Sequence, residues 1–139
     1  MSVDLAHFLT AQDFVYEQVL AELRAGRKRS HWIWFIFPQF AALGRSYRAQ
    51  RFGLRSRAEA ESYLAHPVLG ARLRTCTELL LTLPTTPLTE ILGAPDDTKF
   101  HASMTLFAAV AGPASPYQQA LDRWFGGAAH EATATLLTG

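Results

Sequence analysis

Ser30-His31-Trp32-Ile33-Trp34-Phe35-Ile36-Phe37-Pro38-Gln39 places four aromatic rings within six residues of this 139-residue chain. Rings gathered this closely cannot all face water, so most of them belong to a core. Ser30 has a side chain suited to capping a helix, and Pro38 ends one, so a short helix is expected between them. We therefore predict a central helix that is buried on most sides, with Trp34 at the wall of a pocket.

On both sides of this segment helix signals recur, and the alternation typical of strands is almost absent. Upstream, apolar residues from Phe8 to Leu23 form one broad face of a helix. Downstream, a leucine-rich helix is expected between Pro67 and Pro84. The expected caps are Asp4 or Thr10, Ser30, Ser46, Ser56, Thr86, Pro95 and Ser115, and the expected stops are Gly26, Pro38, Pro84, Gly93, Gly112 and Gly126. The pattern predicts one all-α domain, residues 1–139, of about seven or eight short helices.

Composition narrows the class of protein. Apolar residues make up 49% of the chain and charged residues 18%, which is typical of a globular domain. The aromatic segment is about a third of the length that a membrane span needs, and the N-terminus lacks the form of a secretory signal. The only cysteine is Cys76, so no intrachain disulfide exists and a cytoplasmic location is expected. No metal-binding spacing such as CxxC or HExxH occurs, and we predict neither a metal site nor a cofactor.

Charge is distributed very unevenly along the chain. Residues 24–57, the basic strip, hold nine bases and no acid, although the whole chain has a formal charge of only +1. These bases are Arg24, Arg27, Lys28, Arg29, Arg45, Arg48, Arg51, Arg55 and Arg57. Cations beside flat hydrophobic rings are suited to hold a ligand that is both anionic and planar.

Four segments of the chain carry a family resemblance: residues 26–39, 43–46 (Leu43-Gly44-Arg45-Ser46), 59–73 and 99–107 (Lys99-Phe100-His101-Ala102-Ser103-Met104-Thr105-Leu106-Phe107). They resemble a bacterial family catalogued as domain of unknown function 1810. Ile33 stands where the family usually has Met, and Ala102 where it often has Ser. The resemblance implies a small all-α cytoplasmic protein and implies no activity. Some members bear a calpastatin label, but nothing in these residues supports protease inhibition.

A fainter likeness points to the NADAR/YbiA-type N-glycosidases. It rests on Gly44-Arg45, on His66-Pro67-Val68-Leu69 followed by Arg72-Leu73, and on an acid near residues 96–97.

The predicted ligand-binding residues are Lys28, His31, Trp34, Arg45, Ser46, Arg51 and Lys99. Lys28 and His31 flank the start of the aromatic helix, where free backbone N–H groups favour an anion. Arg45 offers a planar fork for phosphate beside Gly44, whose backbone can approach a ligand closely. Each residue also has a structural interpretation: Ser46 as a helix cap, Arg48, Arg51 and Arg55 as the solvated face of one helix, and Lys99 as the partner of Asp96 or Asp97.

Two residues are candidates for proton transfer, His31 and Asp97. No GxSxG elbow accompanies Ser103, so a serine triad is not predicted. The sequence leaves open whether the protein is an enzyme.

We expect the protein to bind, and in an enzyme variant to hydrolyse, a phosphorylated small molecule such as a nucleotide or an ADP-ribose-like compound. One alternative is a protein-interaction or self-assembly module that uses the basic strip. Another is non-specific binding of nucleic acid, against which the small overall charge argues. No membrane partner is expected, and the oligomeric state is left open.

Overall fold

The computed structural model describes residues 4–138, and within them the chain forms helices and no strand. The helices are α1 (Ala6–Ala25), α2 (Ile33–Ile36), α3 (Tyr47–Phe52), α4 (Arg57–Ala65), α5 (Leu69–Thr82), α6 (Leu88–Leu92), α7 (Asp96–Ala111), α8 (Pro116–Phe125) and α9 (Glu131–Thr138), with a 3-10 turn, η1, at Ala41–Leu43. The predicted all-α class is confirmed.

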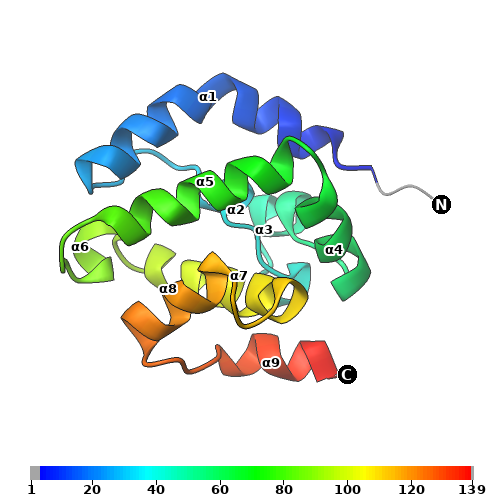
Figure 1. Cartoon of the computed structure of the whole chain (residues 1–139). Coiled ribbons are helices and arrows are strands. Elements are labelled where there is room, and N and C mark those ends of the chain that lie inside the picture. The colour runs from blue at the N-terminus through cyan, green and yellow to red at the C-terminus, as the bar shows by residue number, and fades with distance from the viewer. Residues whose placement is uncertain (1–3, 139) are drawn as a thin grey trace.

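The helices stack in layers from α1 to α9 (Figure 1). α1 covers α5 on one side of the molecule, and α5 in turn packs against α4 and α8. α7 packs against α4, α6, α8 and α9, so the C-terminal helix lies on the opposite side from α1. The short α2 lies between these layers, where it contacts α1, α5, α7 and α3. This position confirms the prediction of a central helix.

Several predicted helix ends are confirmed by their hydrogen bonds. Ser46 Oγ accepts from the backbone N–H of Ala49 at 3.1 Å, and Ser56 Oγ accepts from that of Glu59 at 3.1 Å. α1 ends at Gly26, whose φ of 73° is the left-handed conformation that glycine adopts without strain. Local side-chain chemistry therefore defines these boundaries.

Three details differ from the sequence prediction. Ser30 does not cap α2: the N-cap position is Trp32, and Ser30 Oγ donates to Glu22 Oε2 at 2.5 Å. Thr10 lies inside α1 and bonds back to the Ala6 carbonyl, whereas Asp4 accepts from the Ala6 N–H. Arg55 does not share a helix with Arg51, because α3 ends at Phe52.

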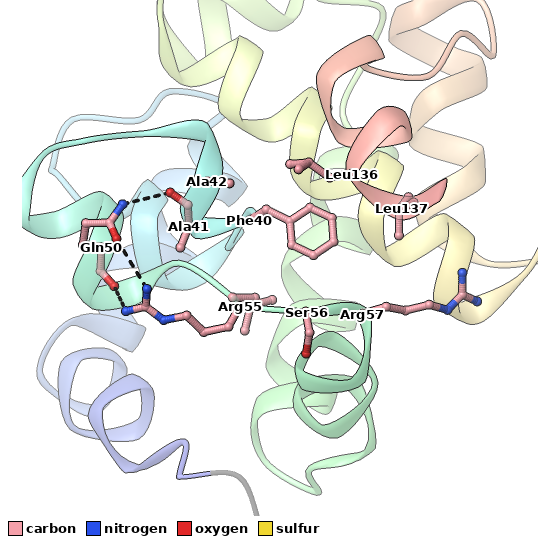
Figure 2. A pocket seen from close by; sticks show the side chains of 10 residues that line it. Phe40, Ala41, Ala42, Gln50, Arg55, Ser56, Arg57, Leu136 and Leu137 are labelled. Atoms are coloured by element: carbon pink, nitrogen blue, oxygen red, sulfur yellow. Dashed lines mark hydrogen bonds between the residues drawn. The ribbon is translucent and has the colours of Figure 1, made fainter. Parts of the chain in front are cut away.

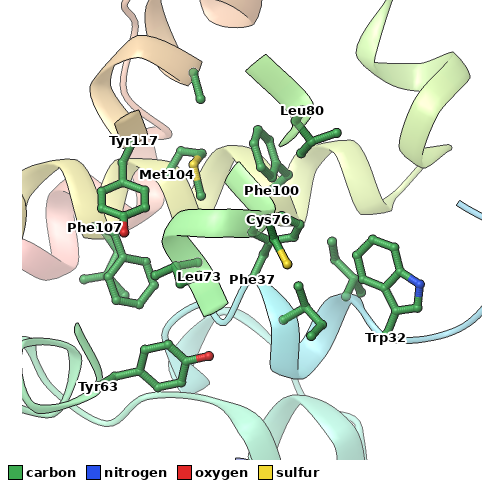
Figure 3. Close-up of a cluster of buried hydrophobic side chains, with 14 of the residues drawn as sticks. Trp32, Phe37, Tyr63, Leu73, Cys76, Leu80, Phe100, Met104, Phe107 and Tyr117 are labelled. Atoms are coloured by element: carbon green, nitrogen blue, oxygen red, sulfur yellow. The ribbon is translucent and has the colours of Figure 1, made fainter. Parts of the chain in front are cut away.

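The core is built around the aromatic segment (Figure 3). Trp32 and Phe37 are almost fully buried, and Phe37 meets the ring of Phe100 edge-on at 4.9 Å between centroids. Trp34 and Phe35 are only partly buried. Two of the four rings thus lie in the core, whereas the prediction placed most of them there, and Trp34 lines neither the cavity beside Arg55 nor the hollow beside Asp97.

Candidate ligand-binding site

Lys28, Trp34 and Lys99, three of the predicted ligand-binding residues, belong to one cluster. Lys28 Nζ lies 2.7 Å from Asp96 Oδ2, and Lys99 Nζ lies 3.6 Å from Asp96 Oδ1. The Lys99 ammonium also lies 4.2 Å from the centroid of the Trp34 ring. Both lysines are largely buried, with side-chain exposures of 7% for Lys28 and 19% for Lys99. Two ammonium groups therefore share one carboxylate, which leaves a net positive charge beside an indole.

The loop that carries Lys28 is held by a buried carboxylate. Glu22 Oε1 accepts from the backbone N–H groups of Arg29 and Ser30 and from Trp32 Nε1, at 2.8, 3.1 and 2.9 Å. Burial opposes ionisation of Glu22, but these hydrogen bonds, with those from Ser30 Oγ and Gln18, outweigh it and lower the pKa of Glu22 to about 2. Glu22 is therefore ionised at neutral pH and fixes the path of residues 29–32.

The remaining predicted residues lie elsewhere. Arg45 and Ser46 directly precede α3 and Arg51 lies within it, whereas Lys28 lies between α1 and α2 and Lys99 lies in α7. Arg51 instead lies near His7, where burial and the Arg51 charge lower the pKa of the imidazole. His31 is exposed.

Asp97 accepts from the N–H of Thr98, its neighbour, at 2.9 Å and lines a hollow of about 500 Å³ with Arg123 and Trp124. His31 does not line this hollow, so the two candidates for proton transfer are not brought together there.

A larger cavity, of about 540 Å³, opens between α3, α4 and α9 (Figure 2). Its lining is Phe40, Ala41, Ala42, Gln50, Leu54, Arg55, Ser56, Arg57, Leu136 and Leu137. Phe40 lies between the leucines of α9 and the polar side chains of Arg55 and Ser56 in Figure 2. One wall of the cavity is therefore apolar and the other carries charge and hydrogen-bonding groups.

The two cavity arginines differ in their partners. The Arg55 guanidinium donates to Gln50 Oε1 at 3.4 Å and to the Gln50 carbonyl at 3.0 Å, both neutral oxygens. Arg57 extends toward α7, where it donates to the Ala109 carbonyl at 3.0 Å, and its Nε lies 3.8 Å from Glu61 Oε1. Arg55 thus keeps an uncompensated charge at the cavity.

Most of the basic strip is likewise unpaired. Of its nine bases, only Lys28 and Arg57 lie within 4.0 Å of a carboxylate in residues 4–138. The other seven are exposed arginines. Their charge is therefore directed to solvent and not to the protein's own acids.

Sequence reasoning did not select the cavity residues. Arg55 and Arg57 were visible as members of the basic strip, and Phe40 follows the aromatic segment closely. Leu136 and Leu137 carried no signal, because only the packing of α9 brings them to Phe40. Among the described residues, no group of three or more His, Cys, Asp or Glu side chains is placed to hold a metal ion, and no helix there is long and apolar enough to cross a membrane.

Comparison with known proteins gives a family and a close structural relative. A crystal structure of the conserved hypothetical protein Rv1873 from Mycobacterium tuberculosis is 45% identical, with a TM-score of 0.94 over 98% of this chain and 97% of that one. No protein of curated function matches the chain. The family described as "Protein of unknown function (DUF1810)" matches residues 2–137. The chain therefore belongs to the DUF1810 family, as its aromatic and basic segments indicated.

Proposed function

We propose that the protein binds a small phosphorylated ligand in the cavity lined by Arg55 and Arg57. The observation that supports this proposal is a cavity of about 540 Å³ with an unpaired guanidinium on one wall and apolar side chains on the other. Cavities of this size accommodate ligands of nucleotide or sugar-phosphate dimensions.

Arg55 supplies the main contact to the anion. Its guanidinium now bonds two neutral oxygens, and a phosphate would add the attraction between opposite charges to its hydrogen bonds. The fork of a guanidinium also matches two phosphate oxygens at once. Arg57 adds charge, although its head group is held at Ala109.

The apolar wall supplies the contact to the body of the ligand. Leu136 of α9 is 40% exposed and so offers hydrophobic surface at the cavity, whereas Phe40, which lines the cavity beside it, is only 5% exposed. A ring or sugar lying against these residues would bury apolar area while its phosphate met Arg55.

The proposal concerns binding and not catalysis. No carboxylate and no imidazole lines the cavity, and Asp97 and His31 lie outside it. The Lys28–Lys99 cluster is the weaker anion site, because an anion there competes with Asp96 for both ammonium groups. Cys76 is buried and free, which accords with the cytoplasmic location expected from the sequence, where phosphorylated metabolites are found.

The test is a thermal-shift screen with nucleoside 5′-phosphates, ADP-ribose, NAD and sugar phosphates at moderate salt. A compound at a hundred times its Kd stabilises the native protein by about 2.7 kcal/mol. Arg55→Ala is expected to weaken binding of that compound about 10- to 150-fold, the value of a charge-assisted hydrogen bond.

Arg24→Ala is the matched control, since it removes the same charge from the C-terminal end of α1, outside the cavity. Equal affinities of the Arg55→Ala and Arg24→Ala variants would contradict the proposal. So would stabilisation that disappears once surface charges are screened.

A further inference from the structure

α3 presents an exposed aromatic ring among arginines that form no ion pair with any acid of residues 4–138. The Tyr47 side chain is 79% exposed, although tyrosine rings are usually at least half buried. Arg45, Arg48 and Arg51 surround it in sequence, are exposed, and make no ion pair within the described residues 4–138. An exposed ring beside several exposed cations is a surface that can take a planar, anionic partner, because the ring offers a stacking face and the charges attract the anion.

Other arginines of the molecule show what a structural role looks like. Arg123 donates to the carbonyls of Leu81, Leu83 and Pro84 at 2.6, 2.6 and 2.9 Å, and so closes the end of α5. Arg72 pairs with Asp13 at 2.9 Å. Among the residues that the structure describes, the arginine side chains of α3 have no such partners, which separates them from the arginines that hold the fold.

The cavity reaches α3 at Gln50, the residue before Arg51. Tyr47 and Arg51 are four residues apart, so about 40° separates them around the helix, and Arg48 lies about 60° further round in the same direction. Gln50 turns the other way: its Nε2 donates to the carbonyls of Ala41 and Gly44 at 2.9 and 2.7 Å, and its side chain lines the cavity. Arg55 bonds the Gln50 carbonyl, so it lies where the cavity meets α3.

We propose that the phosphorylated ligand is the end of a single-stranded nucleic acid. This inference rests on the proposed function: the cavity takes the terminal nucleotide, with its phosphate on Arg55. Arg51 and Arg48 then hold the phosphates that follow, and Tyr47 stacks against a base.

The chemistry favours a nucleic acid strand over an acidic peptide. Side chains three or four residues apart on a helix have Cβ atoms about 5–6 Å apart, and long arginine side chains at this spacing reach successive phosphates of one strand. A base has a flat face for the Tyr47 ring, which an aspartate or glutamate side chain lacks. Outside the basic strip the chain has twelve acids and only four bases, so residues beyond the strip attract a polyanion less than the strip does.

The experiment measures the affinity for a labelled oligothymidylate of about ten nucleotides by fluorescence anisotropy. The affinity for thymidine 5′-monophosphate is measured for the same variants and compared with it. Tyr47→Ala is expected to weaken oligonucleotide binding about 5- to 150-fold, the value of one stacked base. Arg48→Ala is expected to reduce the slope of log K against log salt by about 0.7, the value of one phosphate contact with a single strand. Neither variant is expected to change the affinity for the monophosphate, whereas Arg55→Ala is expected to weaken binding of both the monophosphate and the oligonucleotide.

The possible outcomes separate this inference from the proposed function. Suppose that Arg55→Ala weakens binding of the monophosphate, but Tyr47→Ala and Arg48→Ala bind the oligonucleotide as well as Arg24→Ala does. The inference of a nucleic acid strand is then wrong, and the proposed binding of a small ligand in the cavity is supported. If Arg55→Ala leaves the monophosphate unaffected, the proposed function fails and this inference fails with it. Displacement of the oligonucleotide by polyglutamate with the same affinity, independent of Tyr47, would also overturn the inference.

Discussion

Glu22 shows how a single residue organises a loop that carries charge. Its carboxylate is 7% exposed and receives hydrogen bonds from Arg29, Ser30, Trp32 and Gln18. Neutral donors thus compensate a buried negative charge within a strip that contains nine bases. The direction of the Lys28 loop depends on this one side chain.

Replacement of Glu22 by Gln should destabilise the protein, because an amide presents its own N–H₂ to donors that need an acceptor. We expect the free energy of unfolding to fall by about 1–3 kcal/mol at neutral pH, measured by chemical denaturation. Glu17→Gln, an exposed change on the same helix, is the control and should have little effect.

The pH dependence gives a second measure of Glu22. Its pKa of about 2 in the folded protein lies below its ordinary 4.5, so the stabilisation is present above pH 4.5 and is lost as the pH falls from 4.5 toward 2. The loss should be smaller in Glu22→Gln than in the wild type. Parallel curves for the two proteins would contradict this account.

At the scale of elements, the crossing of α4 and α5 depends on a residue without a side chain. Gly70 lies in the first turn of α5, and a Cβ added there would overlap the carbonyl oxygen and carbon of Leu64 in α4. The corner before it is closed by His66, whose Nδ1 accepts from the N–H groups of Val68 and Leu69 at 3.1 and 3.2 Å. The two helices are therefore packed backbone to backbone.

The Gly70→Ala substitution tests this packing, because two physical effects predict changes of opposite sign in the free energy of unfolding. Helix propensity alone predicts that Ala stabilises α5 by about 1 kcal/mol. The clash with rigid backbone predicts a loss of about 1–3 kcal/mol instead, and we expect the loss. Ala71→Gly, at the exposed neighbouring position, controls for propensity and should cost about 1 kcal/mol; a stabilised Gly70→Ala would show that α4 can move away.

At the scale of the whole molecule, the core shields the only thiol. Cys76 is fully buried between Leu73 and Leu80 of α5 and the rings of the aromatic core (Figure 3). Burial raises the pKa of Cys76 to about 12, and the nearby Arg72 charge and the Tyr16 hydroxyl offset this only in part. The reactive thiolate is therefore nearly absent while the protein is folded.

Disulfide reagents should consequently modify Cys76 only when the whole domain opens. The labelling rate is expected to rise with denaturant in parallel with unfolding, as followed by circular dichroism. Thr75→Cys places a second thiol at the exposed neighbouring position, and it should react at once in the native protein. Rapid labelling of the wild-type protein without denaturant would show local opening of α5.

Local features of the chain determined most of the helices. Ser46 and Ser56 cap because their hydroxyls reach an N–H three residues away, and Gly26 ends α1 because its own backbone takes the left-handed conformation. Such interactions involve neighbours along the chain, so the sequence alone indicates them. The division of the aromatic segment was predicted only in part, because Phe35 as well as Trp34 is partly exposed.

Only the tertiary structure decided which distant residues meet. Ser30 has the chemistry of a cap, yet the buried Glu22 carboxylate is a stronger acceptor and takes its hydroxyl. Lys28 reaches Asp96 of α7, and the leucines of α9 close the cavity beside Phe40 and Arg55. These contacts depend on how the helices pack, because they join residues that are far apart in the sequence and that local interactions along the chain cannot bring together.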